Sequence, residues 1–194
     1  MIYIYPLLSF SVKYYGIIKC IQYYFDQIPQ TCIICAPTGK AANWLGENAS
    51  TIHRTLETIY DPELDTYNFQ KNIKNPIKSD LIIIDESSMI DMDMMFNLLR
   101  ACKDNLTLLF VGDENQIPSV NYGDIFNSLI KTNYIPCTLL TKIFRQGEGS
   151  IISLLAKHII KQVIPSIQVM NDKEKNETQF INIKDNTYND ILKT

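Results

Sequence analysis

Several features that would narrow the function quickly are missing from this sequence of 194 residues. It has no excess of positive charge, since 18 Lys and Arg stand against 21 Asp and Glu. A nucleic-acid contact would therefore need a local basic patch. The apolar N-terminus reaches only to Lys13 and is too short to cross a bilayer. It also lacks a basic segment and a small-residue cleavage site, so a signal peptide is the less favoured interpretation. Internal repeats are absent as well.

A disulfide framework is also missing. The five cysteines are scattered and odd in number, which fits a reducing compartment. Cys32 and Cys35 form one CxxC, but positions three apart on a strand point to opposite faces and cannot bind one ion. Without a second ligand pair we do not expect zinc. We interpret Cys32 and Cys35 as core residues. We expect a protein of the cytoplasm, or of the nucleus in a eukaryote, with no membrane partner.

What the sequence does contain is an alternation of helical and buried-strand patterns in an ordinary globular composition, 46% hydrophobic and 20% charged. This alternation predicts an α/β fold, a parallel sheet with helices on both faces. The expected helices cover residues 14–27, 40–49, 89–103, 124–131 and 150–163, and the expected strands cover residues 31–35, 81–84, 106–111 and 138–140. Residues 61–80 form a polar stretch. We predict one domain over residues 1–170, followed by a linker and the start of a second, truncated domain over residues 171–194.

Two acidic residues follow the second predicted strand in the segment LIIIDESSM. Parallel sheets bind ligands at the carboxyl ends of their strands, so Asp85 and Glu86 would face a bound phosphate there. Asp85 is suited to hold Mg²⁺, which keeps most of its waters and takes few carboxylates. Glu86 is suited to deprotonate an attacking water. The alternative is a pair of solvated acids that caps the next helix.

The third strand repeats this pattern in LTLLFVGDENQIPSV. Asp113 emerges at the same edge after Gly112, and Gln116 can both donate and accept hydrogen bonds at a terminal phosphate. An ordinary strand-to-loop turn would look the same. Arg145 follows the fourth strand, where a guanidinium can neutralise charge on a transferring phosphoryl group. Alternatively, Arg145 is a surface salt-bridge partner.

Four segments together resemble the motifs of RecD-like superfamily 1 DNA helicases, including the TraA conjugative relaxase-helicases. The segments are CAPTGKAANWL with TIHRTLE, LIIIDESSMID, LLFVGDENQIPSV and LTKIFRQGEGS. The match covers roughly residues 16–165. It implies a RecA-like domain, of the P-loop NTPase type and incomplete at the N-terminus, that pairs with a second RecA-like domain or subunit, with ATP between them and single-stranded DNA across the top.

The resemblance also implies roles for single residues. Asp85 would bind Mg²⁺ and Glu86 would activate water, while Gln116 and Arg145 would contact the γ-phosphate. Pro37, Thr38, Gly39 and Lys40 match the motif that contacts the DNA backbone. There, a small-residue turn presents N–H groups to phosphate, and Lys40 adds charge. His53 matches a position near the DNA path, and a core or capping histidine is an equal alternative.

The family's phosphate-binding loop is not recognisable. TGKA at residues 38–41 fails the signature GxxxxGK[ST], because Ile34 and Ala41 occupy the positions of the first Gly and of the Ser or Thr. Lys13 lies at the expected distance before APTG and is the candidate phosphate lysine. However, Leu7, Val12 and Tyr14 replace the two glycines and the hydroxyl residue around it. Such side chains prevent the close backbone approach that cradles phosphate.

Two explanations fit this gap. The chain is either a truncated or misread copy of a helicase, or a small nucleic-acid-binding or interaction module without turnover. We favour the first because the four candidate catalytic residues are present. In both cases we expect weak or absent ATP hydrolysis. A small-molecule kinase is disfavoured because it also needs the loop, and because GDENQIPSV with FRQ is not its pattern.

Overall fold

A computed structural model describes the backbone of residues 2–6, 12–140 and 158–163, with side chains for residues 16–140 and 158–163. The chain forms two compact units, residues 1–145 and 146–194. The described part of the second unit is a helical turn at residues 158–160 that leads into residues 161–163. The predicted domain boundary at residue 170 lies outside the described residues and stays a prediction.

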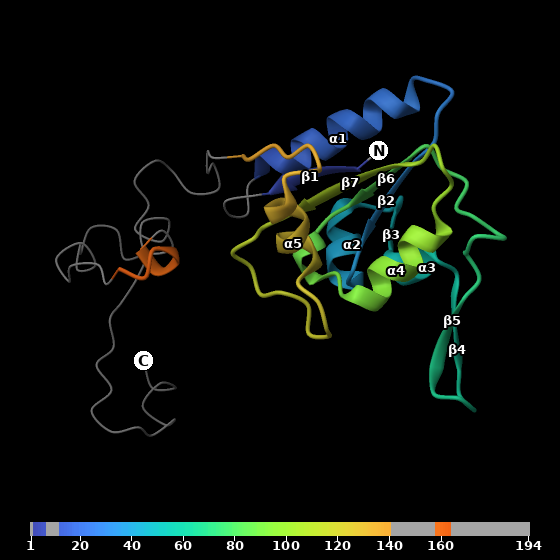
Figure 1. Ribbon diagram of the computed structural model, residues 1–194. Coiled ribbons are helices and arrows are strands. Elements are labelled where there is room, and N and C mark those ends of the chain that lie inside the picture. Colours follow the sequence, from blue (N-terminus) through green and yellow to red (C-terminus); the bar gives the residue numbers. More distant parts are fainter. Residues whose placement is uncertain (1, 7–11, 141–157, 164–194) are drawn as a thin grey trace, which may run out of the picture. The chain divides into compact units, whose positions relative to one another are not determined.

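The first unit is built on a five-stranded sheet in which every neighbouring pair is parallel (Figure 1). The order across the sheet is β1-β7-β6-β2-β3. The strands are β1 (Ile2–Pro6), β2 (Cys32–Ala36), β3 (Ala49–Thr51), β6 (Leu81–Ile84) and β7 (Thr107–Gly112). The central β6 is buried at every position, as expected for a strand with helices on both of its faces.

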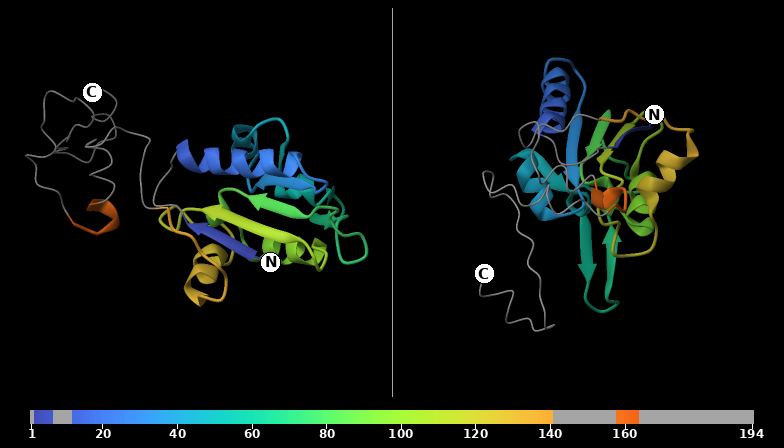
Figure 2. Two further views of the ribbon diagram at one scale, coloured as in Figure 1. Left: turned by 90° about the horizontal axis from the view of Figure 1, so that it is seen from above. Right: turned by 90° about the vertical axis from the view of Figure 1, so that its left-hand side faces the viewer.

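Helices cover both faces of this sheet (Figure 2). On one face lie α1 (Val12–Asp26) and α2 (Gly39–Leu45), which pack Ile18 and Leu45 against alternate residues of the strands. The other face is covered by α3 (Ile52–Thr55), α4 (Met92–Ala101) and α5 (Ile125–Thr132). A short 3-10 helix, η1 (Ser87–Met89), links β6 to α4. The predicted parallel α/β architecture is therefore confirmed.

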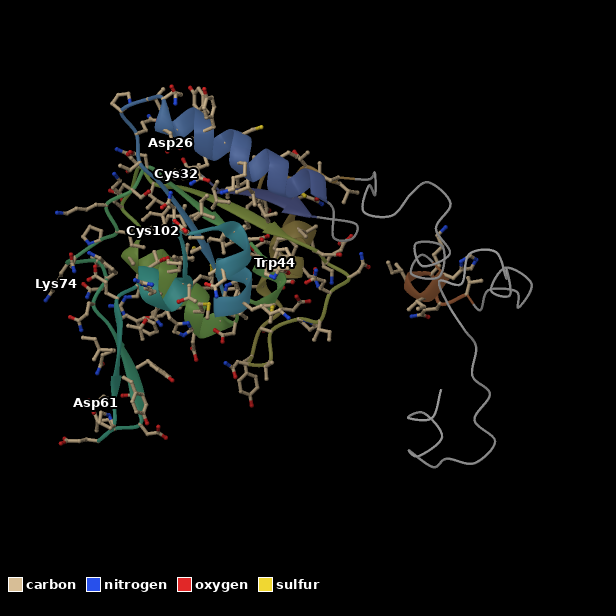
Figure 3. All side chains as sticks on the ribbon, turned by 180° about the vertical axis from the view of Figure 1, so that it is seen from behind. Asp26, Cys32, Trp44, Asp61, Lys74 and Cys102 are labelled. Carbon is tan, nitrogen blue, oxygen red and sulfur yellow. The ribbon has the colours of Figure 1, made fainter. Side chains whose placement is uncertain are left out.

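A two-stranded antiparallel hairpin stands apart from the main sheet. Its strands are β4 (Thr58–Asp61) and β5 (Thr66–Phe69), and Figure 1 shows it projecting from the body of the first unit. Asp61 lies near its tip (Figure 3). At its base, His53 of α3 contacts the rings of Tyr67 and Phe69 at centroid distances of 6.1 and 6.4 Å. Residues 61–80 were predicted as a polar stretch, so this hairpin was not predicted.

Other boundaries also differ from the predictions. The predicted helix over residues 40–49 ends at Leu45, because Gly46 leaves the helical conformation at φ 113°, and β3 follows at once. The predicted strand at residues 138–140 is replaced by single bridge-type pairings at Cys137 and Leu140. Asp91 caps α4 by accepting from the amide of Met94 over 2.7 Å, so this helix starts later than expected.

Candidate nucleotide and nucleic-acid site

The carboxyl ends of four neighbouring strands meet at one edge of the sheet. Because β6 pairs in parallel with both β2 and β7, the segments after these three strands emerge side by side. The edge strand β1 ends there as well, with Pro6 in register with Gly112. The candidate residues 37–40, 85–86 and 113–116 all lie on these segments. The structure thus brings the predicted phosphate side and DNA side of the site to one edge.

Asp85 is held by the last rung of the sheet. Its amide N–H donates to the carbonyl oxygen of Cys35 over 2.9 Å, one residue beyond the end of β6. The residue is only 4% exposed, so its carboxylate is fixed close to the protein interior. A carboxylate in this position fits Mg²⁺ bound mainly by water and substrate phosphate oxygens.

Glu86 has a strained backbone. Its φ of 52° and ψ of 40° lie in the left-handed region, which L-residues other than Asn and Asp rarely adopt. The carbonyl of Glu86 accepts from the amide of Met89 over 3.0 Å and so starts η1. Strain of this kind is concentrated at functional sites, where it fixes the direction of a side chain. The left-handed backbone therefore fixes the direction in which the Glu86 side chain leaves the chain.

Asp113 and Gln116 lie in a tight turn at the end of β7. Asp113 is 5% exposed, and its Oδ1 accepts from the amide of Asn115 over 2.9 Å. The amide of Gln116 donates to the carbonyl of Asp113 over 3.2 Å, and the Gln116 side chain is half-buried. Asp113 therefore closes a strand-to-loop turn, which is the structural alternative that we weighed against a phosphate contact. The turn also holds Gln116 near the sheet edge.

Gly112 is required by the packing behind this turn. A Cβ at Gly112 would lie 3.0 Å from Cζ of Phe126 and 3.1 Å from the backbone nitrogen of Ser88. The end of β7 is thus in close contact with both α5 and η1. Ser88 itself is buried, and its hydroxyl has no hydrogen-bond partner among the described residues. Ser88 was not predicted as a site residue, although LIIIDESSM places two serines directly after Asp85 and Glu86.

The DNA-side candidates follow β2. Thr38 caps α2 by accepting from the amide of Ala41 over 3.2 Å, while Gly39 and Lys40 are exposed. Pro37 is half-buried at the end of the strand. His53 is half-buried against the hairpin aromatics and neither belongs to the core nor caps α3, so the alternative role that we weighed for it is wrong. Its predicted contact with DNA stays a prediction.

Two predicted residues cannot be placed in this geometry. Arg145 lies outside the described residues, and of Lys13 only the backbone is described, in the first turn of α1. Within residues 16–140 and 158–163, no group of three or more His, Cys, Asp or Glu side chains could hold a metal ion. A magnesium site would therefore depend on Asp85 and a bound phosphate. The described helices include none with the length and hydropathy to span a membrane.

The CxxC cysteines lie as predicted. Cys35 belongs to the core on the α3–α5 side of the sheet, while Cys32 packs against the core on the α1–α2 side. Burial raises the pKa of Cys35 to about 12 and that of Cys32 to about 11. These thiols are poor metal ligands and nucleophiles, because both roles need the thiolate.

Comparisons with known proteins show the family to which this chain is similar. The profile of the AAA domain family matches residues 14–122. The chain is 36% identical over 151 residues to the ATP-dependent RecD2 DNA helicase of Deinococcus radiodurans, covering 76% of this chain and 20% of that protein. It is 31% identical over 121 residues to the RecBCD enzyme subunit RecD of Haemophilus influenzae, covering 50% of this chain and 18% of the subunit.

The fold is also similar to solved structures. A crystal structure of Pif1 from a Bacteroides species, in complex with ADP-AlF4, superposes with a TM-score of 0.58 at 22% identity. The alignment covers 90% of this chain and 47% of the Pif1 chain. This likeness confirms the predicted RecA-like fold. The chain spans about a fifth of the length of the curated relatives described above.

Proposed function

The chain belongs to the AAA domain family, in its RecD-like superfamily 1 helicase branch, and from this we propose that it is part of an ATP-dependent DNA helicase motor. In the proposal it contributes the first RecA-like domain and binds single-stranded DNA. Alone, it hydrolyses ATP weakly or not at all. The observation that carries the proposal is the position of Asp85, Glu86 and Gln116, which follow two adjacent parallel strands at one sheet edge.

The proposed roles follow from chemistry and position. Mg²⁺ and ATP would supply a polarised γ-phosphoryl group, and Asp85 would hold the ion at the end of β6. Glu86 would orient and deprotonate the attacking water, with its direction fixed by the left-handed backbone. Gln116 and Arg145 would contact the γ-phosphate, and Asp113 would hold the turn that carries Gln116. Pro37, Thr38, Gly39 and Lys40 would contact the DNA backbone.

The phosphate-binding side fits ATP poorly in this chain. The strand β1 ends at Pro6 and α1 begins at Val12, so a strand precedes a helix as in a phosphate-binding motif. However, the stretch from Leu7 to Tyr14 has no glycine, and Tyr14 stands where a Ser or Thr would ligate Mg²⁺. The acidic side of the site is therefore complete while the phosphate cradle is not, and we assign no hydrolytic step to this chain alone.

A second candidate function is also consistent with the missing phosphate-binding loop. A nucleic-acid-binding or interaction module, derived from a helicase and free of turnover, needs the DNA side of the edge and tolerates loss of the loop. The exposed Lys40 and the projecting hairpin are available for this role. In both versions, unwinding and translocation would need a second RecA-like domain or subunit.

Two measurements test the proposal. Binding of fluorescein-labelled single-stranded DNA, followed by anisotropy without nucleotide, should be detectable and should weaken steeply with salt. Lys40→Ala should reduce both the affinity and the salt dependence. Robust ATP hydrolysis by the unmodified chain, abolished by Glu86→Gln, would overturn our account of the missing loop. A chain that does not bind DNA under any salt condition would overturn the DNA-binding part.

A further inference from the structure

The single tryptophan of the chain, Trp44, is on the surface. It lies on α2 and is 78% exposed (Figure 3). An indole is large and apolar, and tryptophan is highly buried on average in folded proteins. Within the described part of the chain, the ring of Trp44 contacts no other aromatic ring. An indole held in water in this way is suited to bury its face against a ligand.

The packing of α2 fixes where the indole points. Ala42 and Leu45 are each 3% exposed and face the sheet, so Asn43 and Trp44 are directed outward. Lys40 precedes Trp44 by four residues, so the two side chains share one helix face. Their Cα atoms are separated by about 6 Å along the helix axis. A single nucleotide can span this distance between its phosphate and its base.

A second cation, Lys19, lies near the C-terminal end of α2 and donates to Oε1 of Gln22 over 3.2 Å. The Nζ of Lys19, on α1, is 3.4 Å from the position that a Cβ on Gly46 would occupy, two residues beyond Trp44. The helix α2 has no acidic residue, and the first acid after it is Glu47, beyond the helix end at Gly46. Lys40 is therefore the charged side chain that shares the face of α2 with Trp44. Aromatic faces bordered by cations are the usual means of binding single strands without sequence preference.

We infer that Trp44 stacks on a base of single-stranded DNA whose adjacent phosphate is bound by Lys40. This inference rests on the proposed function and extends it from backbone contact to a base contact. A stack of this kind accepts any base, because every base presents a π-face. It excludes intact duplex DNA, in which the base faces are already covered by their neighbours. Trp44 would thus make the site selective for unpaired strands.

Tryptophan fluorescence measures the proposed contact directly, because Trp44 is the only tryptophan in the sequence. Titration of the full chain with unlabelled oligo-dT should quench its emission and reduce its access to acrylamide. A blunt duplex of the same length should cause neither change. In parallel, anisotropy of labelled oligo-dT should show that Trp44→Ala weakens binding on the order of 10- to 100-fold. Trp44→Phe should recover part of this loss.

The matched control is Tyr23→Ala. Tyr23 is also a strongly exposed aromatic residue, 69% exposed on α1, and its removal should leave the affinity unchanged. Trp44→Ala should keep the salt dependence of binding, whereas Lys40→Ala should reduce the logarithmic salt slope by about 1. Chemical unfolding of each variant checks that the fold is intact.

The outcomes separate this inference from the proposed function. If oligo-dT binds but Trp44 emission, acrylamide access and the affinity of Trp44→Ala are unchanged, the stacking contact is wrong and DNA binding stands. If emission changes with protein concentration in the absence of DNA, Trp44 belongs to a contact between copies and the inference is overturned. If no DNA binds, the proposed DNA-binding function fails with it.

Discussion

The amide of Asp85 donates to the carbonyl of Cys35 over 2.9 Å, across the carboxyl ends of β6 and β2. This bond joins the two sides of the proposed site. Asp85 is the candidate metal ligand and precedes Glu86, the candidate base. Cys35 lies in β2, shortly before the DNA-side residues Thr38 and Lys40. A shift of the acidic segment must therefore move the start of the DNA-side segment, unless this rung breaks.

The strained backbone at Glu86 predicts a gain of stability from glycine. Glu86→Gly should raise the free energy of unfolding by about 1 kcal/mol, because glycine adopts the left-handed region without steric cost. Glu86→Gln keeps the left-handed backbone strain and should therefore not gain this stability. As a control, Asn133→Gly should gain less, since Asn133 has a φ of 55° and asparagine tolerates this region. Urea denaturation measures all three, and destabilisation by Glu86→Gly would contradict the strain.

At Gly112 we expect the opposite effect on stability, because even a small side chain would meet neighbouring atoms. Gly112→Ala should destabilise the fold by about 1–3 kcal/mol, because its Cβ would meet the Ser88 backbone as well as the movable ring of Phe126. Gly16→Ala is the control, since nothing lies within 4 Å of its Cβ and alanine favours the helix. The control should stabilise the chain in the same urea measurement. Equal effects of the two substitutions would rule out close packing at Gly112.

Asp80 predicts a dependence of stability on pH. It accepts from the amide of Thr31 over 2.9 Å and from Nζ of Lys103 over 3.3 Å, and the Thr31 backbone bond, followed by Lys103, lowers the pKa of Asp80. The stabilisation is therefore present above the unfolded pKa, near 3.9, and is lost as the pH falls through the folded pKa.

The corresponding experiment compares Asp80→Asn with the unmodified chain. The substitution should destabilise the fold at pH 7 and have a smaller effect at an acid pH below the folded pKa, where Asp80 is protonated. Asp104→Asn is the control, because Asp104 is exposed and makes none of these bonds. A destabilisation by Asp80→Asn that is the same at both pH values would show that the charge of Asp80 is not involved.

The cysteines predict an order of alkylation. Cys20 is exposed on α1 and should react first with iodoacetamide at pH 8. Cys35 should react last, because it is fully buried and its pKa is raised to about 12. Mass spectrometry of timed samples measures the order, and all five cysteines should react rapidly in urea. Early labelling of Cys35 in the folded chain would contradict its place in the core.

Much of this fold was predictable, because its strands are short aliphatic runs bounded by polar residues. The bounds of the strand Leu81–Ile84 were predicted to the residue. The acids after it lie at the carboxyl edge of the sheet, as expected. The pairing of β1 was not predictable in this way. Ile2 pairs with Leu108, so the partner strand lies far along the chain, and no local pattern indicates it. The apolar N-terminus was weighed only against membrane and signal segments.

The hairpin and Trp44 show a different limit. Residues 58–69 contain Asp61, Pro62 and Asp65, which favour turns, and each strand is too short for a clear alternation. Trp44 follows apolar helix spacing and could not be assigned to the core or the surface until α2 was placed. Its exposure depends on Ala42 and Leu45 taking the inner face, which only tertiary packing decides.

In our proposal, this chain keeps the acidic residues of an ATP site while the residues of the phosphate cradle are replaced. The most direct test is binding of a fluorescent ATP analogue with Mg²⁺ to the unmodified chain and to the triple variant Leu7→Gly, Val12→Gly, Tyr14→Thr. We predict no saturable binding to the unmodified chain and saturable, magnesium-dependent binding to the triple variant. Saturable binding to the unmodified chain that Asp85→Asn weakens would contradict the account.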